Sequence, residues 1–278
     1  MRTFSHPADF AEAALPYWKK HPILCLLQRG LTQGLICDWD SSKKVAVRDA
    51  VMHAHSAGTS AWFALQTNPG RPIILAGDAP PDEADMVRLR SLYPNLKGVN
   101  GERQLSYDFA EAYGRPFRLQ NDLLLYALSR EAWSNKGFKF PGQLRLASLE
   151  ELELAAQWVK EFVLFIREVG DGEDYQERAR ALIEAKHLYF YCLDGQPVTM
   201  AASTRQAGGT AAINYVFTPE NWRGRGFATA GVGALCDRLL MKYDNLMLYA
   251  DANYPASNAV YLKLGFEECG VGVELVFE

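Results

Sequence analysis

Short apolar runs separated by glycine-containing turns predict a strand-rich region in the second half of the chain. The runs 188–193, 197–204 and 211–217 follow one another, with Asp194-Gly195 and Gly208-Gly209 between them. Asp-Gly and Gly-Gly pairs between strand-like runs are typical of tight hairpin turns. We therefore expect three consecutive strands that pair in a meander.

Helical spacing of apolar residues predicts the elements on both sides of these strands. A strand at 142–146 precedes two helices, the first capped by Ser148 with Glu151 three residues on and the second ending near Lys186. A helix follows the third strand, then a strand at 245–250, another helix, and a final strand at 271–277. The order β-α-α-β-β-β-α-β-α-β indicates an α+β fold, with a mixed sheet flanked by helices.

The first half of the chain has a similar but less regular pattern. Strands are expected at 60–65 and 72–76 and a helix near 83–93, while 2–14 resembles 144–156 and 121–127 resembles 245–250. Two alternatives stay open: a separate α/β domain, or a diverged copy of the second half. We expect the boundary within 134–142, which gives an N-terminal domain at 1–140 and a C-terminal domain at 141–278.

The chemistry is concentrated in the segment Arg223-Gly224-Arg225-Gly226-Phe227-Ala228, which joins a predicted strand to a predicted helix. Glycines let the backbone approach a ligand closely, and the first N–H groups of a helix have no acceptor within the helix. Two arginines in the same turn suit an anion with several phosphates. A Walker A loop is excluded because no lysine follows Gly226, and a dinucleotide fingerprint is weakly matched because Thr229 stands at its third small position.

A third pattern fits better: Arg223, Gly226 and Ala228 satisfy Gln/Arg-x-x-Gly-x-Gly/Ala. This loop, the preceding 218–222, and the later Asn258, Tyr261 and Gly265-Phe266 occur in the order found in the GNAT acyltransferases. Residues 141–278 thus resemble that superfamily, and Ser257-Asn258 is similar to a branch of acetyltransferases related to glycine N-acyltransferase. One departure is Tyr254, at a position where many members have a cofactor-contacting asparagine; we transfer that contact to Asn258.

The resemblance implies an N-acyltransferase that transfers acetyl from acetyl-CoA, or another acyl from its acyl-CoA, to a primary amine by direct attack. The cofactor would lie between the strands 213–218 and 245–251. Tyr261 is expected to protonate the leaving thiolate. Asp251 is the best single candidate for the general base, but its position before Asn253 favours a turn residue over a base. The expected cofactor-binding residues are Val216, Phe217, Thr218, Arg223, Gly224, Arg225, Gly226, Phe227, Ala228, Thr229 and Asn258.

In the first half, the candidate phosphate loop is 97–103, which lacks the Gln/Arg-x-x-Gly-x-Gly/Ala spacing. If this half is a copy of the fold, we expect it to have lost cofactor binding and to shape the acceptor pocket. The alternative to an enzyme is a non-catalytic acyl-CoA-binding or regulatory protein with the same fold. This alternative stays open because the sequence does not identify a general base.

The amino-acid composition indicates which classes of partner to expect. Residues 141–278 hold 12 basic and 19 acidic residues, and no basic stripe indicates nucleic acid. No apolar run is long enough for a membrane span, and five scattered cysteines favour a reducing, cytoplasmic setting. His53-x-His55 lacks further metal ligands, so no metal is expected. The expected acceptor is a small-molecule amine or a peptide, and a homodimer is left open.

Overall fold

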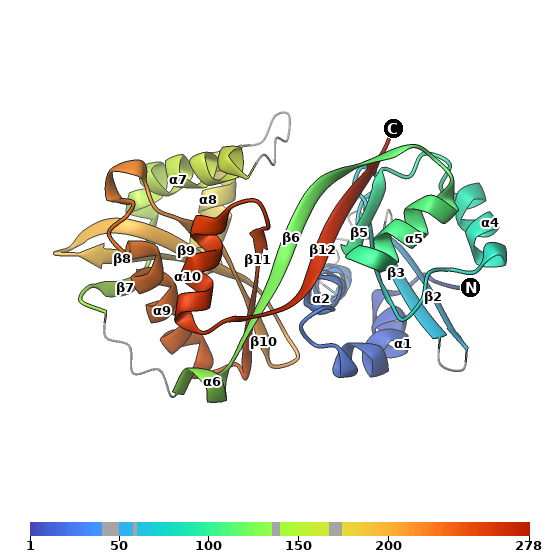
Figure 1. The fold of residues 1–278 in the computed structure, drawn as a ribbon, viewed down its shortest axis with the longest axis horizontal. Coiled ribbons are helices and arrows are strands. Elements are labelled where there is room, and N and C mark those ends of the chain that lie inside the picture. Colours follow the sequence, from blue (N-terminus) through green and yellow to red (C-terminus); the bar gives the residue numbers. More distant parts are fainter. Residues whose placement is uncertain (41–49, 58–59, 135–139, 167–173) are drawn as a thin grey trace. The chain divides into compact units, whose positions relative to one another are not determined.

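The chain forms two compact units. The computed structural model describes residues 1–40, 50–57, 60–134, 140–166 and 174–278. One unit, here called the N-terminal unit, holds Met1–Leu125 together with Cys269–Glu278, and the C-terminal unit holds Tyr126–Glu268 (Figure 1). No helix within the described residues is long and apolar enough to cross a membrane.

The C-terminal unit has the predicted elements in the predicted order. It contains β7 (Gln143–Leu146), α7 (Leu152–Phe165), α8 (Tyr175–Glu184), β8 (Leu188–Leu193), β9 (Gln196–Ala207), β10 (Thr210–Phe217), α9 (Phe227–Leu240), β11 (Asn245–Asp251) and α10 (Pro255–Leu264). Two short 3-10 helices, η1 (Leu149–Glu151) and η2 (Glu220–Trp222), and the helix α6 (Arg130–Ser134) complete it. The expected α+β class, a mixed sheet flanked by helices, is confirmed.

The tight turns of this sheet lie where the glycine pairs predict them. Asp194 and Gly195 have φ of 50° and 81°, and Gly208 and Gly209 have φ of 58° and 78°. Two consecutive positive φ values match the twist of the flanking strands. The strands β7, β8, β9 and β10 are joined by antiparallel pairing, and β10 and β11 are parallel.

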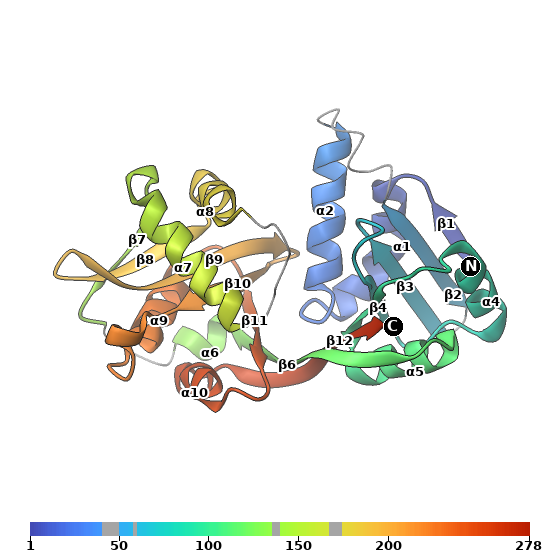
Figure 2. The same ribbon diagram turned by 90° about the horizontal axis from the view of Figure 1, so that it is seen from above.

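Helices cover both faces of this sheet, α7 and α8 on one and α9 and α10 on the other (Figure 2). The first face buries Val159, Val163, Phe190 and Met200 in one apolar cluster. On the other face, a Cβ at Gly231 would lie 2.7 Å from the side chain of Thr199, so only glycine lets α9 lie this close to β9.

The N-terminal unit repeats this order of elements. It contains β1 (Arg2–Phe4), α1 (Pro7–Lys20), α2 (Leu26–Asp40), β2 (Val51–Ala57), β3 (Ser60–Gln66), β4 (Ile73–Gly77), α4 (Glu83–Leu92), β5 (Gly98–Glu102), α5 (Arg103–Tyr113) and, as far as Leu125, β6 (Phe117–Ser129). Its pairing also repeats, since β1 to β4 are antiparallel neighbours and β4 and β5 are parallel. These matches support the alternative of a diverged copy.

The two halves exchange their last strands. The strand β12 (Glu267–Phe277) pairs antiparallel with β5, Leu275 opposite Val99, while β6 is the neighbour of β11 in the strand order. The compact units are 1–125 with 269–278, and 126–268, while the expected boundary near residue 140 stays a prediction. Residues 135–139 of the expected linker lie outside the described part. The resemblance of 121–127 to 245–250 is corrected: by order, β6 corresponds to β12, and β5 to β11.

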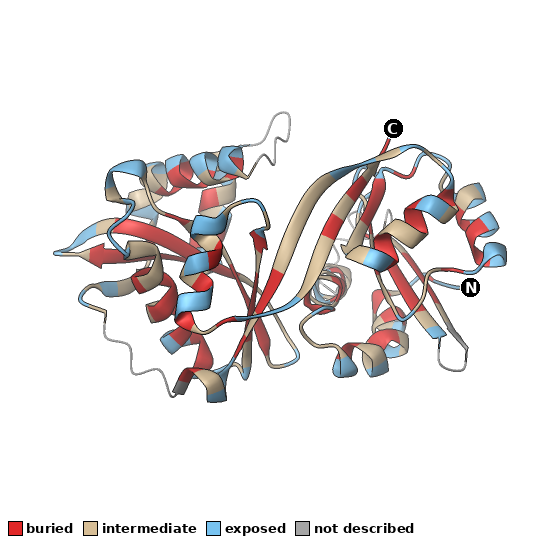
Figure 3. Cartoon of the chain, in the orientation of Figure 1, coloured by how far each residue is buried: buried red, intermediate tan, exposed pale blue. Residues whose placement is uncertain are grey.

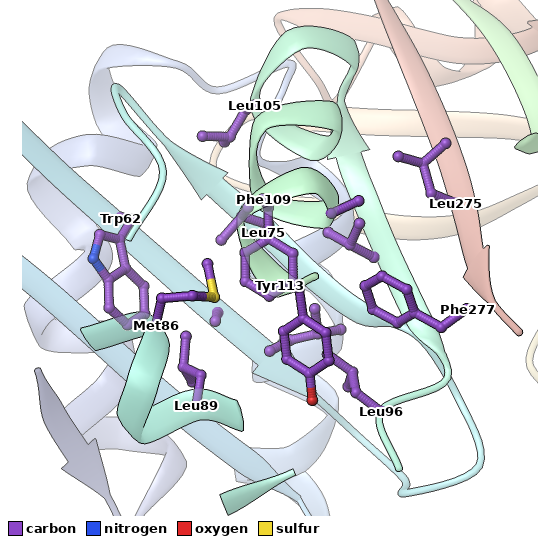
Figure 4. Close-up of a cluster of buried hydrophobic side chains, with 14 of the residues drawn as sticks. Trp62, Leu75, Met86, Leu89, Leu96, Leu105, Phe109, Tyr113, Leu275 and Phe277 are labelled. Atoms are coloured by element: carbon purple, nitrogen blue, oxygen red, sulfur yellow. The ribbon is translucent and has the colours of Figure 1, made fainter. Parts of the chain in front are cut away.

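Hydrophobic patterning could not have predicted the exchange, because an alternating strand looks the same whichever sheet it joins. The alternating burial of β12 is visible in Figure 3. Its residues Val273, Leu275 and Phe277 are buried in the core of the N-terminal unit with Leu75, Val99, Phe109 and Tyr113 (Figure 4). The ring of Phe277 stacks on Tyr113 with centroids 4.8 Å apart.

Candidate active site

The strands β10 and β11 separate part-way along their length. Their parallel register runs from Thr210 opposite Asn245 to Ala212 opposite Met247, and no further pairs follow within these described strands. Beyond that point β10 has an irregular register against β9, and Tyr215 takes a left-handed φ of 50°. A bulge of this kind bends a strand and increases its twist. The edges of both strands beyond it can therefore receive a ligand.

The predicted anion loop lies at the end of β10 and the start of α9. Gly224 has φ of 73°, and Gly226, which precedes the first helical residue Phe227, has φ of 81°. A Cβ at either glycine would meet nothing within 4 Å, so the glycines serve the backbone conformation and leave open space beside it. The first turn of α9 has no acidic residue, and the amides of Phe227 to Thr229 have no acceptor within the helix. This geometry suits an anion.

Both arginines of the loop are exposed and rest on aromatic rings. The Nε of Arg223 donates to the carbonyl of Thr218 at 2.9 Å, and its guanidinium lies 5.9 Å from the ring centroid of Phe165. Arg225 lies 5.2 Å from Trp222. Within the described chain neither arginine forms an ion pair with a carboxylate, so their remaining N–H groups can bind a phosphorylated ligand.

The end of β10 is partly occupied by internal hydrogen bonds. The hydroxyl of Thr199 donates to the carbonyl of Phe217 at 2.7 Å and lies 2.8 Å from the hydroxyl of Thr218. The carbonyl of Thr218 accepts from Arg223. Of the three residues expected to pair with the cofactor through their backbone, Val216 takes part in none of these hydrogen bonds.

Asn258 has an unsatisfied amide oxygen. Its side chain is 9% exposed, and its Nδ2 donates to the carbonyl of Asp251 at 3.1 Å. The Oδ1 atom is buried and has no hydrogen-bond partner among the described residues. An orphaned buried acceptor costs about 1–3 kcal/mol unless a ligand or water donates to it. The position therefore suits the amide N–H of a bound ligand.

Tyr261 lies on the buried side of α10. It is 6% exposed, and its ring contacts Phe266 edge-on, with centroids 6.1 Å apart. Gly265, with φ of 89°, ends the helix and turns the chain back toward this ring. Burial raises the pKa of Tyr261 above its ordinary value, and Tyr126 adds to the shift. The phenol therefore stays protonated at neutral pH.

Asp251 ends β11 and is exposed. One carboxylate oxygen accepts the backbone N–H of Asn253 at 2.8 Å, which is a local turn contact. The structure brings Asn258 of α10 next to Asp251 at the end of β11. The Asp251 side chain, however, stabilises the local turn.

Two aromatic residues beside this site were not identified from the sequence. Phe165, at the end of α7, packs edge-on against Tyr254 with centroids 4.8 Å apart, and Arg223 lies over the same ring. Phe165 thus links the segment that follows β10 to the segment that follows β11. The other missed residue is Tyr126, which contacts Tyr261 with centroids 6.0 Å apart. It lies in the first half of the sequence, and no local pattern connects it to the site.

Residues 153–266 match the model of the acetyltransferase (GNAT) family. This part of the chain is similar to the GNAT family. The matched range falls inside the 141–278 expected from the sequence and spans the anion loop, β11 and α10. No sequence among curated proteins matches this chain.

Solved structures support the GNAT fold over both units. A Drosophila protein aligns with a TM-score of 0.69 and 13% identity, over 100% of this chain and 98% of its own. A GCN5-related N-acetyltransferase from Kribbella flavida has a TM-score of 0.56 and 18% identity, over 92% and 95%. A tandem GNAT protein from the clavulanic acid biosynthesis pathway has a TM-score of 0.51 and 12% identity, over 82% and 83%. At these identities the likeness concerns the fold, and the tandem protein supports the arrangement in two domains.

The N-terminal unit differs from the C-terminal unit in the segment that corresponds to the anion loop. Gly101 on β5 faces Leu75 on β4, and a Cβ at Gly101 would lie 2.5 Å from the Leu75 carbonyl oxygen. The loop between β4 and α4 contains Asp78 and Asp82, and the first turn of α4 is acidic. An acidic helix start repels phosphate. The expected loop at 97–103 is corrected here: it forms β5 and the start of α5.

The two histidines on β2 have separate partners. His53 is fully buried, with one ring nitrogen 3.0 Å from the hydroxyl of Thr3 and the other 2.6 Å from that of Tyr93. His55 lies 2.8 Å from a carboxylate oxygen of Asp85 and, with Asp82, forms a potential metal-binding group among the described residues. The other oxygen of Asp85 pairs with the Met1 ammonium at 2.9 Å. Asp85 thus contacts both Met1 and His55, and we assign no metal to this group.

His53 makes the stability of the N-terminal unit depend on pH. Burial lowers its pKa from 6.5 to about 4, so the unfolded chain binds a proton between these values that the folded chain does not. Stability is therefore complete above pH 6.5 and falls as the pH drops toward 4. We expect His53 to contribute a loss of about 3 kcal/mol over this window. Denaturant unfolding at pH 7 and pH 4.5 measures the free energy of unfolding of the wild type and of His53→Gln. The loss of free energy between the two pH values should be larger in the wild type, and an equal loss in both proteins would contradict this role of His53.

Proposed function

We propose that the chain is an acyl-CoA-dependent N-acyltransferase that transfers acetyl from acetyl-CoA to a primary amine by direct attack. One observation carries the proposal: a glycine-containing loop with two arginines lies beside the separation of β10 and β11, within the part of the chain that matches the GNAT family model. The Ser257-Asn258 pair supports the branch related to glycine N-acyltransferase, which remains part of the proposal.

The residues present fit acetyl-CoA in three places. The amides of Gly224 to Thr229, with Arg223 and Arg225, would hold the pyrophosphate. The backbone of Val216 would pair with the pantetheine arm in the manner of an added strand. The orphaned Oδ1 of Asn258 would accept one of its amide N–H groups, which would remove the cost of that buried oxygen.

When bound, acetyl-CoA supplies an acyl group activated as a thioester. Tyr261 would hold its proton at the phenol oxygen and give it to the sulfur as the carbon–sulfur bond breaks. The attacking amine must lose a proton in the same process, and Asp251 could take it directly or through water.

A non-catalytic acyl-CoA-binding protein is the second candidate. It is favoured by the turn contact in which the Asp251 carboxylate accepts the backbone N–H of Asn253.

Ligand binding followed by turnover tests the proposal. Acetyl-CoA at a hundredfold excess over its Kd should stabilise the protein by about 2.7 kcal/mol, which raises the melting temperature by several degrees. ATP and NAD, at equal concentration, should not. Thiol release across a panel of amines then reports transfer. Stabilisation by ATP or NAD alone would refute acyl-CoA as the ligand, and binding without amine-dependent thiol release would favour the non-catalytic candidate.

Arg223→Ala should weaken acetyl-CoA binding. A charged hydrogen bond to phosphate contributes about 1.5–3 kcal/mol, so we expect the Kd to rise roughly 10- to 150-fold. The turnover number at saturating cofactor should change little. Isothermal titration with acetyl-CoA measures the Kd, and Arg238→Ala, in the last turn of α9 and away from the loop, is the matched control. An unchanged Kd in Arg223→Ala would exclude this residue from the phosphate site.

A further inference from the structure

We infer that Tyr126, from the first half of the chain, positions Tyr261 for proton transfer in the C-terminal unit. The inference rests on the proposed function, in which Tyr261 is the proton donor. It identifies Tyr126 as a positioning residue, since it acts through Tyr261.

The exchanged strand β6 brings Tyr126 into this unit. The last four residues of β6, from Tyr126 to Ser129, belong to the C-terminal unit, and β6 neighbours β11 in the strand order. Tyr126 is 2% exposed, and its ring centroid lies 6.0 Å from that of Tyr261, with the ring planes inclined at 47°. Both rings are thus buried and in contact.

Tyr261 is contacted by two aromatic rings of different origin. Phe266 follows two residues after the end of its own helix and meets the ring edge-on. Tyr126 precedes Tyr261 by more than a hundred residues in the sequence and contacts the same ring at a different inclination. Aromatic pairs with such geometry contribute about 0.5–1.5 kcal/mol beyond the burial of their surface.

The position of the Tyr261 hydroxyl depends on these contacts because the side chain can rotate only as far as its neighbours allow. Loss of the Tyr126 ring would leave a cavity beside Tyr261 that the surrounding structure fills only partly. The phenol could then move away from the sulfur, and a displacement of about 1 Å can lower a rate by about a hundredfold. Burial raises the pKa of Tyr126 as well, so both phenols are neutral and the contact is one of packing.

This role predicts a separation of turnover from cofactor affinity. In the full chain, Tyr126→Leu should lower kcat roughly 10- to 100-fold while the Kd for acetyl-CoA stays within about twofold. Tyr126→Phe keeps the ring and should restore kcat to within about threefold of the wild type. Tyr189→Leu is the matched control, because Tyr189 is a similarly buried tyrosine on β8 of the same unit. It should lower the melting temperature without a selective loss of kcat.

The outcomes distinguish this inference from the proposed function. If the wild type transfers acetyl to no amine, the proposed function fails and the inference fails with it. If the wild type is active and Tyr261→Phe is impaired while Tyr126→Leu keeps its kcat, only the role of Tyr126 is refuted. Equal losses of kcat and cofactor affinity in Tyr126→Leu would show a structural role and refute it too. Should Tyr126→Leu not fold, Tyr126→Met, which retains more apolar volume without a ring, provides the same comparison.

Discussion

Removal of residues 269–278 is expected to unfold the N-terminal unit, although these residues are the last in the sequence. They include Leu275 and Phe277, which are 0% and 7% exposed and lie in the core formed by the first half of the chain. Loss of a buried leucine or phenylalanine costs about 2–5 kcal/mol each. Loss of the β5–β12 pairing adds to this, while a domain's whole stability is about 5–15 kcal/mol.

Hydrogen exchange of the segment 98–113 measures this effect, because β5 and α5 contact the exchanged strand. Protection there should fall to that of an unfolded chain after the truncation. Two point variants provide a matched pair: Leu275→Ala should cost about 2–5 kcal/mol, and Leu119→Ala, at a 43% exposed position, less than about 0.5 kcal/mol. Full protection in the truncated protein would mean that β12 is not part of this core.

Tyr261→Phe should lower kcat by a factor of about 10²–10⁴, the usual contribution of a positioned proton donor. The Kd for acetyl-CoA should remain within about twofold, because the substitution removes one hydroxyl and keeps the ring between Tyr126 and Phe266. The wild-type rate should also show no loss through this group below about pH 10, since burial raises the Tyr261 pKa above its ordinary value.

Steady-state kinetics with a fixed amine, together with titration of acetyl-CoA, separates the two effects. Tyr243→Phe, in the same unit but on the loop between α9 and β11, is the control and should behave as the wild type. A Tyr261→Phe protein with normal kcat would require another proton donor. One with weakened cofactor binding and unchanged kcat would make Tyr261 a binding residue.

Much of the C-terminal unit follows from local sequence pattern. The alternation and turn residues that predict β8, β9 and β10 act over a few neighbouring positions, and the structure has these strands with positive φ at Asp194 and Gly195. The anion loop is equally local, since its glycine spacing and its place between a strand and a helix are visible in six residues. The family match over 153–266 spans both segments.

The rest of the site depends on contacts between distant residues. The sequence places Asn258 on a helix, but only the structure shows its unsatisfied Oδ1. Phe165 reaches Tyr254 and Arg223 because α7 packs across the sheet, which helical spacing alone does not specify. In the N-terminal unit, the acidic start of α4 becomes meaningful once α4 is known to correspond to α9.

The sequence by itself determined the order of elements in the second half and the placement of the glycine turn 223–228 between a strand and a helix, because each depends on neighbouring residues. Tertiary structure alone decided which sheet each final strand joins. An alternating strand can pair with either sheet, and its choice depends on the total apolar surface that each arrangement buries. That choice carries β12 into the core of the first half and places Tyr126 beside Tyr261 in the second.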